Sequence, residues 1–300
     1  LTKSPTDQFP EIEKAFGMLK ADQSGRENVF TAVCQVMSLW GHYRNKQGRQ
    51  IMLVAITDEA GDDHGAPLEV AINRCRRKGA KAYVIGPSAP FGARKGYVPY
   101  VAPENGKTYQ LPVDLGPDAA IPSLVRLPFW FSGPQYNRPP LSSGFAPYAL
   151  ARLVTETGGI YFMSKMTTMA GLTPLGHYDA AAMRPFEPDY SYASPADCLK
   201  DIARHPLRMA VYNASIASRQ FQANSTPRLD IRVTAGNFKQ VASDAQKSVA
   251  ESILMIDQIL QAFPRGIEQA YSMELSPRWR VAFALAYGRL LAQKVRCMEY

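Results

Sequence analysis

Ile51-Met52-Leu53-Val54-Ala55-Ile56-Thr57 is a run of seven residues without a charge, and it gives the strongest indication of the fold class. A continuous apolar run of this length is typical of a strand in a parallel sheet that helices cover on both sides. The sequence therefore predicts that strand 51–57 is buried on both faces. An acidic loop follows the strand directly, with the sequence Asp58-Glu59-Ala60-Gly61-Asp62-Asp63.

Helical patterns alternate with further strands on either side of this run. Apolar residues at three- and four-residue steps predict helices over 11–20, 27–43, 67–78 and 147–157, and short apolar runs predict strands at 81–86 and 159–163. A strand, a helix and a second parallel strand form a β-α-β unit, for which a right-handed crossover is expected. The first part of the chain is therefore predicted to be an α/β domain.

A segment rich in proline interrupts this alternation. Residues 85–150 contain 12 of the 23 prolines of the chain. Within the segment, Asn105-Gly106 favours a tight turn and predicts a hairpin of strands 97–101 and 109–113. Residues 133–147 are rich in Pro, Gly and Ser, a composition that is typical of a loop. We interpret residues 87–146 as an insertion between two elements of one sheet.

The strand pattern stops after residue 163, and the remainder is predicted to be mostly helical. Helices are expected over 206–221 and 237–263, and a third begins at Ser276-Pro277, where a capping serine precedes a proline at the first helical position. With 300 residues the chain has room for one large or two modest domains. We predict an α/β domain over 1–163 and a helical extension over 164–300.

Composition excludes several classes of protein. The net charge of +8 is spread evenly, since residues 164–300 hold 16 Lys and Arg against 12 Asp and Glu, which leaves +4 for each part of the chain. Nucleic-acid binders concentrate positive charge on one element, so no nucleic-acid partner is expected. The sequence has no apolar run of eighteen residues, and thus no membrane span is expected. The four cysteines and four histidines lie at spacings that form no metal-binding motif.

The acidic loop after strand 51–57 is the one constellation that points to chemistry. In a parallel sheet, ligands bind beyond the carboxyl ends of the strands, where this loop lies. Carboxylate oxygens suit Mg²⁺, Mn²⁺ or Ca²⁺, and Asp58 stands at the mouth of the strand. The alternative is a solvated acidic turn in which Asp62 or Asp63 caps the helix that begins near Pro67.

The residues in order resemble the von Willebrand factor type A domain, as found in bacterial proteins. The resemblance rests on four segments: the run from Ile51 to Glu59, similar to the central strand that ends in Thr-Asp-Gly; Ser24 to Ala32, similar to the preceding turn and helix; Ala82 to Gly86; and Leu150 to Phe162. It covers residues 11–163 apart from the insertion. The resemblance implies a Rossmann-like, doubly wound and mostly parallel sheet, whose first part would lie upstream of Leu1.

The resemblance also implies a binding function. Members of this family hold a divalent cation such as Mg²⁺ in a metal-ion-dependent adhesion site, which a carboxylate of a protein partner completes. Asp58 matches the aspartate of one ligand loop, and Glu27 stands where a second loop has threonine. The Asp-x-Ser-x-Ser loop of the family is not found in this chain. The expected metal ligands are therefore Asp58 and Glu27, in a degenerate site.

Three hypotheses follow for the function. The first is a protein–protein or protein–ligand binding module that uses the loops around Glu27 and Asp58, with the insertion as a second contact surface. The second is a metal-dependent hydrolase, with Asp58, Glu59 and Asp62 as ligands or bases and His64 as acid–base; the third is a metal-free structural or interaction protein. Gly86 and Met163 end the other strands and supply no second acid, which favours binding over catalysis.

The resemblance has a further consequence for strand 51–57. This strand is central in the family, whereas here one of its edges has no obvious neighbour. An uncharged strand with an open edge invites association with other chains. We therefore expect these residues to need the upstream half of the domain, or a partner strand, to stay soluble.

Overall fold

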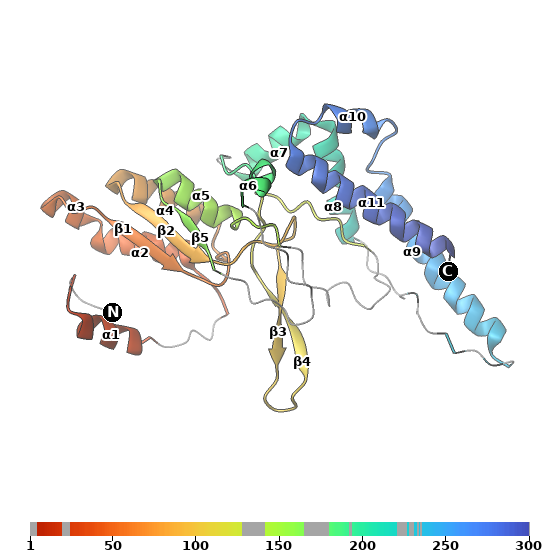
Figure 1. Ribbon diagram of the computed structural model, residues 1–300, viewed down its shortest axis with the longest axis horizontal. Coiled ribbons are helices and arrows are strands. Elements are labelled where there is room, and N and C mark those ends of the chain that lie inside the picture. The colour runs from red at the N-terminus through yellow and green to blue at the C-terminus, as the bar shows by residue number, and fades with distance from the viewer. Residues whose placement is uncertain are drawn as a thin grey trace.

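The computed structural model describes residues 5–19, 25–127, 142–164, 180–191, 194–220, 227, 231–232, 234 and 236–299. It is a mixed α/β structure with a small parallel sheet near the N-terminus and a group of helices near the C-terminus (Figure 1). A β-hairpin projects from the region between these two parts (Figure 1).

The parallel sheet has three strands in the order β1-β2-β5. Its strands are β1 (Met52–Ile56), β2 (Lys81–Gly86) and β5 (Tyr161–Met163). Helix α4 (Ala66–Lys78) connects β1 to β2, and helix α5 (Tyr148–Thr157) precedes β5. Ala55 is paired with Val84, and Ile85 with Phe162. The predicted β-α-β unit and its parallel strands are thus confirmed.

Three helices form the layer that covers the sheet, namely α2 (Val29–Trp40), α4 and α5. Their buried side chains meet Leu53, Ala82 and Val84 of the strands in one hydrophobic core. Arg152 of α5 is buried as well, and its guanidinium forms an ion pair with Glu69 of α4. This pair ties two of the covering helices to each other.

The opposite face of the sheet is open, so the prediction that strand 51–57 is buried on both faces is wrong. Met52 is 68% exposed, Val54 49% and Ile56 76%, whereas Leu53 between them is buried. Side chains alternate across a strand, and all three covering helices contact the same side. The free edge expected for β1 is observed, since β2 is its one strand partner among the described residues.

The helices predicted near the N-terminus are present, but their bounds differ from the prediction and one of them is divided in two. Helix α1 spans Phe9–Gly17, where 11–20 was predicted. The helix predicted over 27–43 is two helices, α2 and α3 (His42–Gln47), because the first ends at Trp40 and the chain turns at Gly41.

The predicted hairpin is confirmed. Strands β3 (Gly96–Val101) and β4 (Thr108–Val113) pair antiparallel, with Tyr100 directly opposite Tyr109. Gly106 in the turn has a φ of +63°, a backbone conformation that glycine adopts without steric cost. The loop predicted over 133–147 lies mostly outside the described residues, and its described part enters α5.

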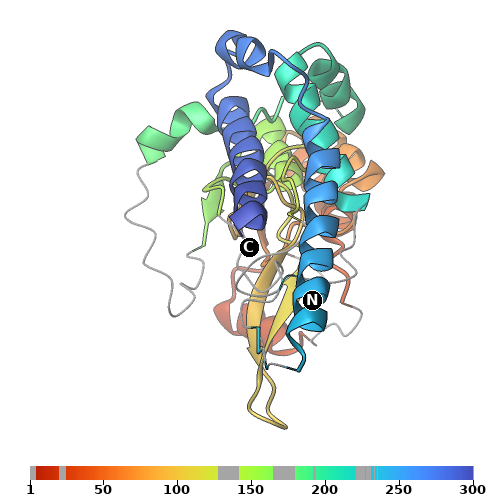
Figure 2. The same cartoon turned by 90° about the vertical axis from the view of Figure 1, so that its right-hand side faces the viewer.

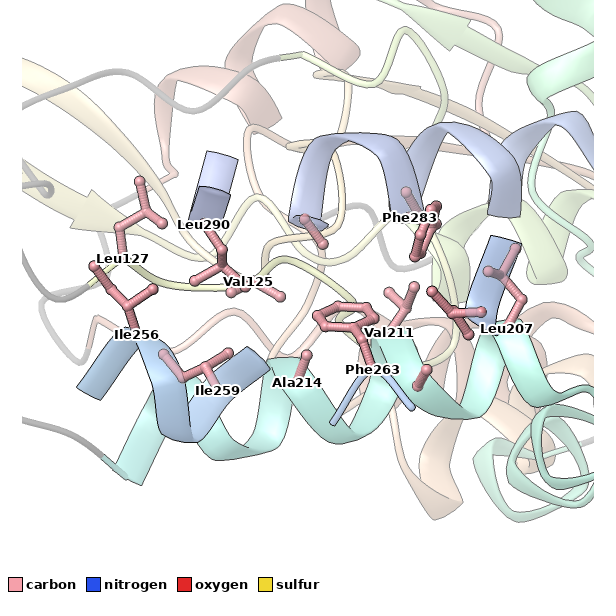
Figure 3. Packing of buried hydrophobic residues seen from close by; sticks show 14 of the residues in the cluster. Val125, Leu127, Leu207, Val211, Ala214, Ile256, Ile259, Phe263, Phe283 and Leu290 are labelled. Atoms are coloured by element: carbon pink, nitrogen blue, oxygen red, sulfur yellow. The ribbon is translucent and has the colours of Figure 1, made fainter. Parts of the chain in front are cut away.

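The C-terminal part is a bundle built mainly by α8 (Pro206–Gln220), α9 (Phe238–Leu260) and α11 (Pro277–Glu299), which confirms the three predicted helices. Helices α9 and α11 lie side by side (Figure 2). Figure 3 shows the core between the helices, where Val211, Ile256, Phe263, Phe283 and Leu290 point toward one another. Across the described residues, no helix combines the length and hydrophobicity that crossing a bilayer requires.

Four short helices in this part were not predicted: α6 (Ala180–Met183), η2 (Arg184–Phe186), α7 (Pro195–Ala203) and α10 (Ile267–Met273). The sequence does contain a local signal for the start of helix α7. Ser194 caps the helix by accepting the N–H of Asp197 at 3.3 Å, and Pro195 stands at the first helical position. The same Ser-Pro pattern predicted α11 correctly.

Part of the insertion belongs to the core of the bundle. Val125 and Leu127 are buried against α8, α9 and α11 (Figure 3). The Ser215 hydroxyl lies 3.2 Å from the carbonyl oxygen of Leu124, and Arg126 donates its N–H to the Ser218 hydroxyl at 2.9 Å. The insertion therefore connects the sheet to the bundle by packing as well as by covalent continuity.

A buried ion pair secures this connection. Asp118 of the insertion is completely buried, and its carboxylate pairs with Arg278 of α11 and accepts the N–H of Gly92 at 3.3 Å. The Arg278 guanidinium also donates to the carbonyl oxygen of Phe186 at 3.3 Å and lies 4.9 Å from the centroid of the Phe91 ring. Each charge thus has partners that compensate for its removal from water.

We predict that Asp118→Ala lowers the free energy of unfolding by about 3–5 kcal/mol, because it leaves the Arg278 charge buried without its partner. Asp257→Ala is the matched control, since it removes the same side chain from a partly exposed pair with Lys294. Its expected cost is about 1 kcal/mol or less. Urea denaturation followed by circular dichroism measures both, and equal losses would contradict the role assigned to Asp118.

Candidate functional site: the acidic loop cluster

Five acidic residues gather at the carboxyl end of β1, and we call them the acidic loop cluster: Glu27, Asp58, Glu59, Asp62 and Asp114. Three of them follow β1 in the loop that leads to α4. Glu27 comes from the turn before α2, and Asp114 comes from the end of β4. The parallel sheet and its covering helices therefore bring together three segments that lie far apart in the sequence.

Thr57 contacts one predicted metal ligand, Glu27, and the loop that carries the other, Asp58. It is the residue after β1, and its hydroxyl donates to a carboxylate oxygen of Glu27 at 2.9 Å. It also accepts the N–H of Glu59 at 3.2 Å, which shapes the loop that carries Asp58. The structure thus places Glu27 and Asp58 in one cluster, with Asp58 exposed and one Glu27 oxygen occupied by Thr57.

Asp62 and Asp63 attach the loop to the N-terminus of α2. Asp62 donates its N–H to the carbonyl oxygen of Glu27 at 2.7 Å, and its carboxylate accepts the N–H of Glu27 at 3.2 Å. The Asp63 carboxylate accepts the N–H of Phe30 at 3.2 Å and that of Thr31 at 2.6 Å. These are unpaired amides of the first helical turn, where the helix dipole favours negative charge.

The alternative that Asp62 or Asp63 caps the helix near Pro67 is therefore wrong. The residue at the N-cap of α4 is Gly65, which has no side chain to cap with. Asp63 caps α2 instead, because α2 and α4 pack side by side and α2 begins next to the loop. The sequence favoured α4 because this helix follows the loop directly, whereas α2 precedes the loop by about thirty residues along the chain.

Glu59 is the member of the cluster whose pKa is raised. Its partial burial, together with the negative charges of Glu27, Asp58, Asp62 and Asp114, raises the pKa of Glu59 to about 6. Arg94 forms an ion pair with Asp114 at 3.3 Å and partly offsets this charge. The cluster as a whole remains strongly negative.

Asp114 is the member of the cluster that sequence reasoning missed. Its carbonyl oxygen accepts the N–H of Ala60 at 2.9 Å, which fixes the end of the hairpin against the loop. Gly116 allows this approach: it has a φ of +71°, and a Cβ there would lie 2.4 Å from that of Ala60. The local signal is an acidic residue at the end of a strand two positions before a glycine.

His64, the proposed acid–base of a hydrolase, is held within its own loop. Its Nδ1 lies 3.0 Å from the carbonyl oxygen of Gly61. Within the described parts of the chain, no group of three or more His, Cys, Asp or Glu side chains is arranged to hold a metal ion. Glu27 and Asp58 offer carboxylate oxygens for a cation, but they do not by themselves form a complete set of ligands.

Comparison with known proteins yields no match: no protein-family model, no curated protein and no solved structure is similar to this chain. Functional argument therefore rests on the geometry of the cluster.

We predict that Glu59 makes stability depend on pH. Its pKa is about 6 in the folded protein against an ordinary 4.5, so the folded state binds more protons than the unfolded state between these values. Stability contributed by the protonated side chain is present below pH 4.5 and is lost as the pH rises through about 6. In Glu59→Gln the side chain cannot ionise, so this decrease in stability with rising pH should be absent.

At pH 7 the Glu59→Gln protein should be more stable than the wild type, by less than about 1 kcal/mol because solvent screens the side chain. The difference should vanish below pH 4.5. Urea denaturation across this pH range measures it. Glu104→Gln, in the exposed hairpin turn, is the control, and an equal pH-dependent gain there would refute the cluster as the cause.

Proposed function

We propose that the chain is a protein-binding module of the von Willebrand factor type A kind, which engages its partner through the acidic loop cluster. The observation that carries this proposal is the hydrogen bond between Thr57 and Glu27 at the carboxyl end of a parallel strand, in the loop cluster that also holds Asp58. This edge of a parallel sheet is where such folds bind ligands. The exposed Asp58 carboxylate is free of the loop contacts that occupy Asp62 and Asp63.

We also propose that the sheet is part of a fold of the von Willebrand factor type A kind. The parallel order β1-β2-β5, with α4 as the connection, is compatible with one half of a doubly wound sheet. Helices on one face alone leave this sheet simpler than the Rossmann-like sheet of that family. The supporting features are strand order and the position of the acidic loop, rather than a complete set of layers.

A divalent cation suits the charge of the cluster. Asp58 and Glu27 would hold it, and a carboxylate of the partner would complete its ligands. Binding of Mg²⁺ or Mn²⁺ would offset the mutual repulsion that raises the pKa of Glu59. The residues of this chain orient the site: Thr57 positions Glu27, and Asp63 anchors the loop to α2.

The hydrolase hypothesis has one observation in its favour, which is Glu59. A carboxylate with a pKa of about 6 is in the range that suits a general base near neutral pH. Binding remains the better proposal, because His64 contacts its own loop, and Asp114, the acid that a second strand end brings to the site, is paired with Arg94. If no cation binds, the remaining hypothesis is a metal-free structural or interaction protein.

Calorimetric titration with Mg²⁺ and with Mn²⁺ tests the metal part of the proposal. We expect heat of binding for the wild type and its loss in Asp58→Ala, whereas the control Asp7→Ala, at an exposed position distant in sequence from the loop, should bind as the wild type does. Absence of heat in the wild type would refute a metal site. Equal heat in Asp58→Ala would remove Asp58 from it.

The hairpin is the proposed second contact surface. It projects away from both cores (Figure 1), and Tyr100, Val101, Tyr109 and Leu111 are exposed on it. Tyrosine is enriched in protein interfaces, since one side chain supplies both apolar area and a polar group. Tyr100 and Tyr109 face each other across the two strands and form one such patch.

We predict that Tyr100→Ser combined with Tyr109→Ser weakens partner binding several-fold in a quantitative pull-down, because the patch loses its apolar area. Removal of the whole insertion is unsuitable, since Asp118, Val125 and Leu127 belong to the buried structure. Lys107→Ser at the exposed turn serves as control. If the double variant retains the wild-type partners in unchanged amounts, the hairpin is not a contact surface.

A further inference from the structure

The two ends of the β1–β2 ladder show which backbone groups of β1 the sheet uses. Strand β1 is the outer strand of the sheet (Figure 1). The carbonyl oxygen of Ile51 accepts the N–H of Lys81 at 3.1 Å, and Thr57 donates its N–H to the carbonyl oxygen of Ile85 at 3.0 Å. Because successive residues of a strand point their backbone groups to alternate sides, residues 51, 53, 55 and 57 bond to β2.

The residues between them direct both backbone groups to the free edge. These residues are Met52, Val54 and Ile56, and each offers one N–H donor and one C=O acceptor that no described residue satisfies. A row of such groups is a template for another strand. Proteins commonly block an edge of this kind with charged residues or proline, and strand 51–57 contains neither.

One antiparallel register between two copies of β1 uses every free group of the edge. With Val54 opposite Val54 of the second copy, Met52 lies opposite Ile56. The residues of each such pair exchange both of their backbone hydrogen bonds. A two-fold axis passes through the Val54 pair, so the contact is the same patch on both copies and closes at a dimer.

The same register brings opposite charges together. Arg49 precedes β1 and is exposed, whereas Asp58 and Glu59 follow the strand. Antiparallel pairing sets Arg49 of each copy opposite Glu59 of the other, and the two-fold axis repeats this contact at both ends. A parallel arrangement would instead set like charges side by side, which destabilises a strand pair. Charge complementarity therefore favours a second copy of β1 in the antiparallel direction.

Helix α2 adds an apolar surface beside this edge. Helix α4 contacts both α2 and α5, and α5 packs against β2 and β5, so α2 lies at the β1 end of the covering layer. Cys34 and Ser38 of α2 contact α4. Val36 and Leu39 lie on the opposite side of the helix and are exposed. A two-fold axis perpendicular to the sheet would place these side chains of the two copies on the same side of the joined sheet.

We propose that β1 pairs antiparallel with β1 of a second copy of this chain, with Val54 opposite Val54, and that the two sheets become one continuous sheet. The pairing satisfies the free backbone groups of the edge and brings the exposed side chains of Met52 and Ile56 together. The dimer requires neither a metal ion nor another protein, so failure of the proposed function would leave it unaffected.

Sedimentation equilibrium of the full chain over a range of concentrations tests the proposal. The wild type should show a dimer that dissociates on dilution. Val54→Pro removes an N–H that the single chain does not use, and proline is tolerated where the N–H of an edge strand faces solvent. Its dissociation constant should rise about tenfold, since the two hydrogen bonds at the axis are lost.

Ala55→Pro is the matched control for folding, because the N–H of Ala55 faces β2. This change should lower the free energy of unfolding of the dilute monomer, measured with urea, whereas Val54→Pro should leave it nearly unchanged. A wild type that stays monomeric at every concentration would overturn the proposal. So would a Val54→Pro protein that folds and dimerises as tightly as the wild type.

A charge reversal outside the strand tests the orientation without changing β1. Arg49→Glu should raise the dissociation constant several-fold, because the new carboxylate would lie opposite Glu59 of the second copy. Arg77→Glu makes the same change of net charge at an exposed position of α4 and should leave the dissociation constant unchanged. Equal effects of the two variants would contradict the antiparallel contact.

Disulfide formation between chains tests the register. In a Cys34→Ser background, in which the remaining cysteines are buried, Val54→Cys should give a covalent dimer under mild oxidation. The Cα atoms of such a pair lie about 5.5 Å apart, which suits a disulfide. Met52→Cys alone is the control, because its two copies would lie about 14 Å apart along the strands. Equally efficient cross-linking of both variants would refute the register.

Discussion

The carboxyl group of Asp118 lies entirely inside the protein, where burial raises its pKa, and the ion pair with Arg278 and the N–H donated by Gly92 oppose that rise. This interaction joins a residue of the insertion to the last long helix across 160 positions of sequence. Two hydrophobic cores lie on either side of it, one under the sheet and one inside the bundle. Their relation to each other depends on this pair and on the insertion residues that pack against α8.

A second constraint shapes the α/β part, namely that α2, α4 and α5 all cover the same face of the sheet. This arrangement sets the N-terminus of α2 next to the loop after β1, where Asp63 caps it. The same proximity brings Glu27 to Thr57 and so assembles the acidic loop cluster. One-sided packing also leaves Met52, Val54 and Ile56 in solvent. The candidate site and the open face are therefore two results of a single packing choice.

Sequence patterns predicted the elements better than their contacts. The strands at 52–56 and 81–86, the hairpin and the long helices all have strong local signals, such as apolar periodicity, Asn105-Gly106 and Ser276-Pro277. Helix α7 has the same kind of signal, at Ser194-Pro195. Burial was harder to predict, because an uninterrupted apolar run reads the same whether one or both faces of the strand are covered. Only the positions of the helices distinguish the two cases.

A short stretch of neighbouring residues was enough to predict that β1 is a parallel strand and that an acidic loop follows it. The sequence also marked Asp58 and Glu27 as candidates for one site. Three features became known only from the packing of the folded chain: Asp114 joins the cluster, Asp63 caps α2 rather than α4, and one sheet face stays open. Each of these depends on which surfaces meet in space, and residues that lie thirty to sixty positions apart in the chain carry no local pattern that records such meetings.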